Sequence, residues 1–185
     1  MFEHFDTPEE LFSFKLGSTL TAERDGVAVL QELAQAARHQ ELQQLLTRHA
    51  DETRDQAEQI ERVFASLGEQ EHTAPAPTAK GLAKEAQATI RKTDSSIADA
   101  SVISAALENE HWEIANYEVL VENAHARGAD EAARLLQQVL DQEIAMSKAL
   151  FGLLQRWSRE GYAVDGGGDG GGRHVDASDA ARAGA

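Results

Sequence analysis

Glutamates stand near the middle of four long apolar patterns in this sequence. Apolar residues recur at steps of three and four along residues 8–38, 40–67, 95–128 and 130–157, which is the spacing of one buried helical face. Each of these faces is interrupted near its centre by an acidic residue: Glu23, Glu52, Glu110 and Glu143. Buried carboxylates are costly unless a cation compensates them, and these faces carry no Lys or Arg. A pair of divalent metal ions is the simplest compensation.

The four glutamates are also expected at one depth. Glu23 and Glu52 lie about 15 and 14 residues from the first predicted turn, and Glu110 and Glu143 each lie about 16 residues from the second. At about 1.5 Å per residue, every one of them is some 20–25 Å from its turn. The sequence therefore predicts that four carboxylates converge in one layer.

Residues beside these positions could add ligands. His49 lies one turn before Glu52, and His111 adjoins Glu110, so each could bind a metal or hydrogen-bond to a ligand. Glu113 could serve as a bridging or terminal ligand in place of Glu110. The chain has no cysteine, so the available oxygen and imidazole donors favour two iron ions, or manganese.

Other polar and aromatic residues near the centre have simpler interpretations. Gln56 is expected to hydrogen-bond to a ligand, and Trp112 and Tyr117 are expected in the core. The remaining histidines, His39 among them, are expected on the surface or in the tail.

The elements that position these residues are long helices. Thr7, Pro8 and Glu10 form a typical helix start, and Asp94 or Ser95 could cap the third long helix. Tight turns join the first two helices and the last two, while about 28 residues with a short helix over 79–92 separate the pairs. Two antiparallel hairpins with one long crossover predict an all-α, ferritin-like four-helix bundle.

The domain limits follow from composition. Residues 1–160 are predicted to form the bundle, and residues 161–185, which include two runs of glycine, are predicted to be a flexible tail. The net charge of −15 argues against nucleic acid as a partner. No apolar stretch reaches membrane-spanning length and no signal peptide is recognisable, so we expect a cytoplasmic protein.

Five segments in order resemble the YciE/YciF-type ferritin-like stress proteins. The matching segments are TAER at 21–24, HADET at 49–53, EHWEIANY at 110–117, AARLL at 132–136 and LDQE at 140–143. The resemblance spans roughly residues 6–157, and the segment at 110–117 is its most specific part. It implies a ferritin-like bundle with a dinuclear metal site, dimer-like association and a link to osmotic or general stress.

The sequence also departs from related patterns. The Glu-x-x-His pair of typical di-iron bundles is absent, because Asp55 follows Glu52 and Met146 follows Glu143 at that spacing. Ser147 stands where the resembled family commonly has an acidic residue. The filling of a second metal position therefore stays open.

Three functions remain in view. The first is a stress protein that oxidises Fe(II) or Mn(II), or removes peroxide, with peroxide or dioxygen as substrate. The second is a metal-sequestering or structural protein without turnover. The third is a metal-free helical interaction module tethered by its glycine-rich tail.

Overall fold

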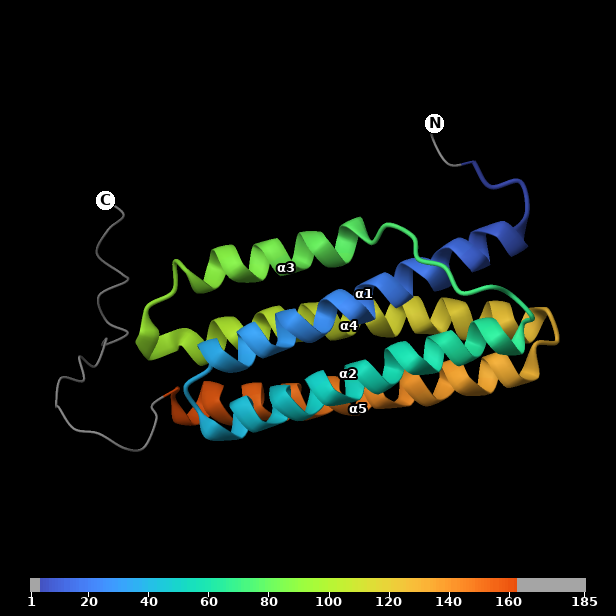
Figure 1. The fold of residues 1–185 in the computed structure, drawn as a ribbon. Coiled ribbons are helices and arrows are strands. Elements are labelled where there is room, and N and C mark those ends of the chain that lie inside the picture. Colours follow the sequence, from blue (N-terminus) through green and yellow to red (C-terminus); the bar gives the residue numbers. More distant parts are fainter. Residues whose placement is uncertain (1–3, 163–185) are drawn as a thin grey trace, which may run out of the picture.

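The computed structural model describes residues 4–162, which fold into long helices packed side by side (Figure 1). The elements are α1 (Pro8–Ala36), α2 (Gln40–Ser66), α3 (Pro77–Ile90), the short 3₁₀ helix η1 (Ser95–Ile97), α4 (Ala98–Ala126) and α5 (Asp130–Glu160). The described residues contain no β-strand. Of the predicted tail, 161–185, residues 163–185 lie outside the described residues.

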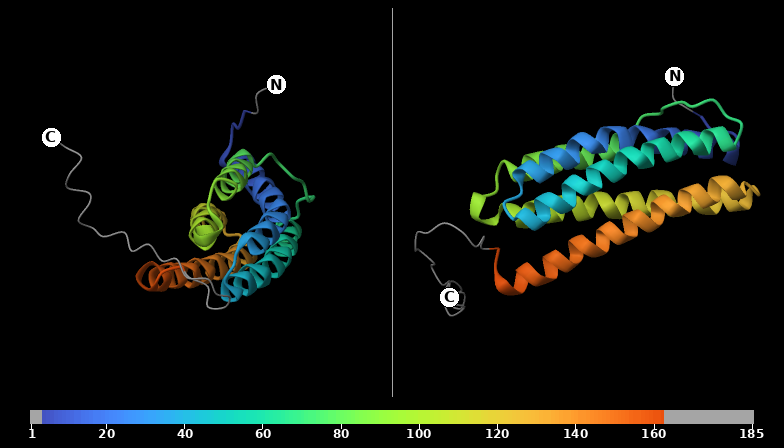
Figure 2. Two further views of the ribbon diagram at one scale, coloured as in Figure 1. Left: turned by 90° about the vertical axis from the view of Figure 1, so that its left-hand side faces the viewer. Right: turned by 60° about the horizontal axis from the view of Figure 1, so that its bottom comes forward.

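Two helical hairpins make the bundle, as the connection lengths predicted. α1 packs along α2 and α4 packs along α5, and the two hairpins meet through the pairs α2–α5 and α1–α4 (Figures 1 and 2). The crossover between the hairpins carries α3, which lies against α4 and α1 on the outside of the bundle. The ferritin-like bundle with one long crossover is confirmed. No helix in residues 4–162 has the length and apolarity to cross a membrane.

The helix ends follow local rules. Thr7 and Glu10 form a reciprocal capping box at the start of α1. Gly68 and Gly128 take φ values of +70° and +66° just beyond α2 and α4, a conformation that glycine adopts without strain. Asp94 accepts a hydrogen bond from the N–H of Ser96, so it caps η1 rather than α4 itself.

The first part of the crossover is tied across α1 by hydroxyl groups. Ser18 Oγ donates to the carbonyl of Pro75 at 2.9 Å, and Thr21 Oγ1 donates to the carbonyl of Ala74 at 2.8 Å. Gly17 allows this approach, because a Cβ there would lie 3.0 Å from the ring of His72. These contacts hold the crossover over one end of α1 and direct α3 along the bundle.

The turn between α1 and α2 is joined to the start of α4. The buried carboxylate of Asp99 accepts hydrogen bonds from the backbone N–H groups of Arg38 and His39, and its Oδ2 lies 2.8 Å from Nδ1 of His39. The His39 ring packs on Trp157 with 4.1 Å between centroids. The expectation that His39 is a surface residue is wrong, because the turn places its ring between Asp99 and Trp157.

Two apolar clusters fill the two ends of the bundle, and the polar layer lies between them. One cluster surrounds Phe12, Phe64 and Leu136, and the other surrounds Leu42, Ile103 and Trp157. Between them, buried polar and acidic side chains from all four long helices face the bundle axis. This layer is where the sequence predicted the carboxylates to meet.

Candidate metal centre

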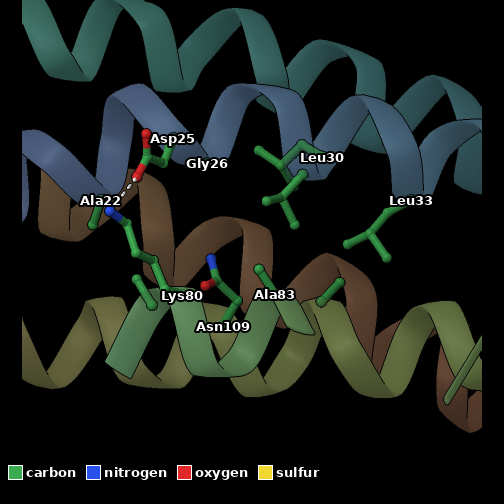
Figure 3. A pocket seen from close by; sticks show the side chains of 11 residues that line it. Ala22, Asp25, Gly26, Leu30, Leu33, Lys80, Ala83 and Asn109 are labelled. Atoms are coloured by element: carbon green, nitrogen blue, oxygen red, sulfur yellow. Dashed lines mark ion pairs between the residues drawn. The ribbon is translucent and has the colours of Figure 1, made fainter. Parts of the chain in front are cut away.

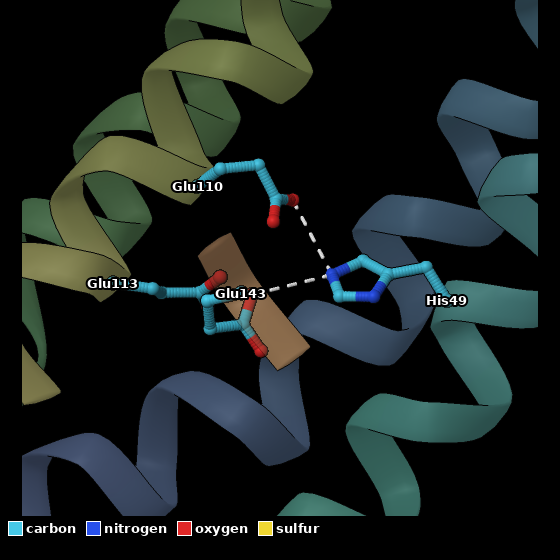
Figure 4. Close-up of side chains that lie close together, drawn as sticks. All are labelled: His49, Glu110, Glu113 and Glu143. Carbon is cyan, nitrogen blue, oxygen red and sulfur yellow. Dashed lines mark ion pairs between the residues drawn. The ribbon is translucent and has the colours of Figure 1, made fainter. Parts of the chain in front are cut away.

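Four buried side chains converge in the polar layer. α2 contributes His49, α4 contributes Glu110 and Glu113, and α5 contributes Glu143 (Figure 4). One donor atom from each lies within 4.8 Å of the donor atoms of the others. Glu110 and Glu113 can act together because residues three apart share one face of a helix. A carboxylate-rich group with one imidazole matches the donor set of iron or manganese sites in helical bundles.

His49 lies between two carboxylates inside the site and one at its edge. Its Nε2 is 3.3 Å from Oε1 of Glu110 and 3.5 Å from Oε2 of Glu143 (Figure 4). Its Nδ1 lies 3.2 Å from Oε2 of Glu52 on the next turn of α2. A carboxylate on the outer nitrogen orients the ring and leaves the inner nitrogen facing the carboxylate group, an arrangement common in histidine ligands of metals.

Glu23 on α1 borders the four-residue group. Its side chain is buried, and the hydroxyl of Tyr117 donates a hydrogen bond to its Oε1. Its other oxygen, Oε2, has no hydrogen-bonding partner. Glu23 is near enough to Glu143 for the charges to repel. All four long helices therefore bring a potential ligand to the layer.

Gln56 lies on the same face of α2 as His49 and reaches α5. Its amide Nε2 donates to Oε1 of Glu143. The other oxygen of Glu143, Oε2, is buried and has only the 3.5 Å contact with Nε2 of His49. The hydrogen bond from Gln56 to a candidate ligand is the role that the sequence predicted for it.

Burial and mutual repulsion make the carboxylates hard to ionise. Burial, followed by repulsion from Glu143, raises the pKa of Glu23 to about 8. Burial also raises the pKa of Glu110 to about 8, in spite of the nearby His49. Burial and the charges of its neighbours, Glu23 first, raise the pKa of Glu113 well above its usual value. For His49, burial alone would lower the pKa, but Glu110 and Glu143 outweigh it and raise the pKa to about 12.

The layer lacks enough positive charge for its carboxylates. The buried polar side chains of residues 4–162 include no Lys or Arg, so His49 is the one group there that can carry a positive charge. Oε2 of Glu110 is buried without a hydrogen-bonding partner, and its Oε1 has only the 3.3 Å contact with His49. Unsatisfied buried carboxylate oxygens are rare in purely structural positions, and divalent cations would satisfy them.

Besides Glu23, which borders the group, two of the predicted site residues lie outside it, Glu52 and His111. Glu52 is 51% exposed and reaches the site only through its contact with His49. The buried face of α2 runs through His49, Thr53 and Gln56, so Glu52 falls beside that face rather than on it. His111, one residue after Glu110, is exposed on the outer face of α4. The structure thus brings together Glu110, Glu113, Glu143 and His49, with Glu23 beside them.

Sequence reasoning did not pair Tyr117 with Glu23. Both residues lie on predicted buried faces, but no local spacing links them because they are far apart in the chain and on different helices. The one indication in the sequence was that the apolar faces carrying Glu23 and Tyr117 were expected to meet in the same layer of the bundle.

Comparison with known proteins places the chain among its relatives. Residues 7–163 match the model of a family described as a domain of unknown function, DUF892. The chain belongs to the DUF892 family. It is 35% identical over 141 residues to protein YciF of Escherichia coli K12, an alignment that covers 75% of this chain and 85% of YciF. The predicted resemblance to YciF-type proteins is thereby confirmed.

Solved structures of DUF892-type relatives share the fold. The crystal structure of the E. coli stress protein YciF superposes with a TM-score of 0.81 and 32% identity, covering 84% of this chain and 99% of that one. YcfI from Rhodopseudomonas palustris, provisionally described as a structural protein, gives a TM-score of 0.78 and 32% identity, covering 81% and 96% of the two chains. These matches support the helical bundle fold.

Proposed function

We propose that this protein is a stress protein that binds two iron or manganese ions in the polar layer and uses them to oxidise Fe(II) or to remove peroxide. The observation that carries the proposal is the group of four buried ligand residues whose donor atoms lie within 4.8 Å of one another. The link to stress comes from YciF, which is described as a stress protein.

The ligands would be Glu110, Glu113, Glu143 and His49, with Glu23 completing the set. Four ionised carboxylates carry four negative charges, which two divalent ions would balance while His49 is neutral. Glu52 would orient the His49 ring from outside. When bound there, two such metal ions would supply the redox chemistry that the reaction with peroxide requires.

The overall reaction balances without a further reductant when Fe(II) is the electron donor. Hydrogen peroxide would take one electron from each of two Fe(II) ions together with two protons, giving two water molecules and two Fe(III) ions. Where the chain's own carboxylates are protonated, metal binding would release those protons, since ligands must be deprotonated.

Metal loading tests the site. The protein would be loaded anaerobically with Fe(II), desalted and measured by elemental analysis beside Glu143→Gln and the control Glu118→Gln, which changes an exposed glutamate on α4. We expect about two metal ions per chain in the wild type and the control, and a clear loss in Glu143→Gln. No bound metal in any of the three proteins would refute the proposal.

A second candidate is a metal-sequestering or structural protein without turnover. Two observations favour it: the provisional description of YcfI as a structural protein, and Ser147, buried one turn after Glu143, where a further carboxylate would have added a ligand. Mixing the Fe(II)-loaded protein with excess peroxide and Fe(II) separates the two. Continued peroxide loss over many equivalents indicates an enzyme, and a single stoichiometric reaction indicates sequestration.

A cytoplasmic location and a homodimer stay predictions from the sequence and from its resemblance to the YciF-type proteins.

A further inference from the structure

A small pocket lies beside the polar layer, where α3 covers the gap between α1 and α4 (Figure 3). Its volume is about 60 Å³. Small side chains on all three helices leave the space open: Ala22 and Gly26 on α1, Ala79 and Ala83 on α3, and Ala106 on α4. The pocket therefore exists because α3 packs here through alanines.

The lining is mostly aliphatic, and its polar members are Asn109 on α4 and the pair Asp25 and Lys80. Leu30 and Leu33 extend the apolar wall along α1 (Figure 3). Asp25 and Lys80 form an ion pair at 3.7 Å, and both are more than half exposed, so they stand at the solvent side. Water inside such a space would find few partners, whereas apolar cavities of this kind accept apolar guests, including xenon.

The pocket shares its inner wall with the candidate metal centre. Ala22 directly precedes Glu23, and Ala106 lies one turn before Glu110 on α4. Both alanines are buried. The pocket therefore lies against the stretches of α1 and α4 that carry Glu23 and Glu110.

We infer that this pocket binds dioxygen and delivers it to the metal centre. Dioxygen is small, uncharged and a poor hydrogen-bonding partner, so it suits a dry aliphatic space. Hydrogen peroxide needs hydrogen-bonding partners on all sides, and the alanines and leucines that make up most of this lining do not offer them. The delivery role rests on the proposed function, because dioxygen reacts only if the centre holds reduced metal. An oxidant that reaches the metal centre through this pocket would therefore be dioxygen.

Xenon is the probe for the pocket itself, because it is apolar, of similar size and visible in crystals without any metal. Crystals of the full chain would be pressurised with xenon, for the wild type, Ala83→Leu and Lys84→Leu. Ala83→Leu fills the pocket from α3, a helix that carries no proposed ligand, whereas Lys84→Leu adds the same side chain on the exposed face of α3. We expect xenon between Ala22, Ala83 and Ala106 in the wild type and the control, and none in Ala83→Leu.

Delivery is tested on the same three proteins by stopped-flow oxidation of bound Fe(II). With dioxygen, Ala83→Leu should react several-fold more slowly than the wild type, while its Fe(II) binding and its reaction with hydrogen peroxide stay unchanged. Absence of xenon from the wild-type pocket, or an unchanged rate with dioxygen in Ala83→Leu, would overturn the inference. Xenon binding without any Fe(II) binding would refute the proposed function and the delivery role while leaving the apolar gas site established.

Discussion

Two histidine–carboxylate contacts between helices of this bundle, His39 with Asp99 and His49 with Glu110, are built in opposite ways. Near one end, the carboxylate of Asp99 receives two backbone N–H groups and Nδ1 of His39. In the middle, Glu110 has only the 3.3 Å contact of its Oε1 with His49, which also lies 3.5 Å from Glu143, and its Oε2 has no hydrogen-bonding partner. A structural carboxylate is saturated by its own protein, whereas one that is left short of partners is suited to an external ligand.

The surroundings of the two histidines differ in the same sense. His39 is partly exposed, and it faces a single carboxylate and the ring of Trp157. His49 is buried among several carboxylates, whose number exceeds the positive charge available in the layer. The first contact stabilises a turn, and the second leaves negative charge that cations can neutralise.

The largest expected effect is on the pH dependence of the metal-free protein. Glu23 and Glu110 have folded pKa values of about 8 against ordinary values near 4.5, so the native state holds protons that the unfolded state has lost. Stability is therefore highest below about pH 4.5 as far as these groups are concerned, and it falls as the pH rises towards 8. For one such proton the loss between pH 5 and 8 is about 3–4 kcal/mol. His49 acts in the same direction above its ordinary pKa.

The measurement is denaturant unfolding with chelator present, from pH 5 to 8. Saturating Mn(II) should flatten the curve, because bound metal replaces the protons. The Asp99→Asn variant should keep the slope of the wild type, since Asp99 belongs to the other contact. A metal-free stability that does not fall over this range would remove the electrostatic basis of the comparison.

A matched pair of substitutions tests whether the two kinds of carboxylate differ in what they contribute to stability and to metal binding. Asp99→Asn puts an amide where two backbone N–H groups need an acceptor, so we expect a loss of about 2 kcal/mol in unfolding free energy with metal binding unaffected. Glu113→Gln resembles the protonated form that burial already favours, so metal-free stability should change little while metal binding falls. Chemical denaturation and calorimetric titration with Mn(II) would measure both. Equal losses of stability in the two variants would contradict the distinction.

The smallest expected effect concerns the carboxylate outside the site. Glu52→Gln weakens the contact that orients His49, and we expect about a ten-fold lower metal affinity with the number of bound ions unchanged. Glu58→Gln, an exposed change on the same helix, is the control. Loss of a whole metal ion in Glu52→Gln would instead make Glu52 a ligand, as the sequence alone had suggested.

Much of the fold follows from local chemistry. The capping box at Thr7, the glycines at 68 and 128 and the three- and four-residue spacing of apolar side chains each act within a few residues. The two short turns and the long crossover then leave few ways to assemble the helices. Acidic residues in the middle of a buried helical face, such as Glu110 and Glu143, could be identified from the same spacing.

Tertiary packing determined which side chains became partners. Glu52 and His49 are both near the inner face of α2, and only the rotation of that helix against α4 and α5 turned His49 inward and Glu52 outward. The pairs Tyr117–Glu23 and His39–Asp99 and the pocket under α3 likewise join segments far apart in the chain. The sequence by itself determined the helices, their order and the acidic layer, because these depend on local spacing. The detailed geometry of the site required the folded bundle, because the rotation of each helix is set by the packing of all its neighbours together.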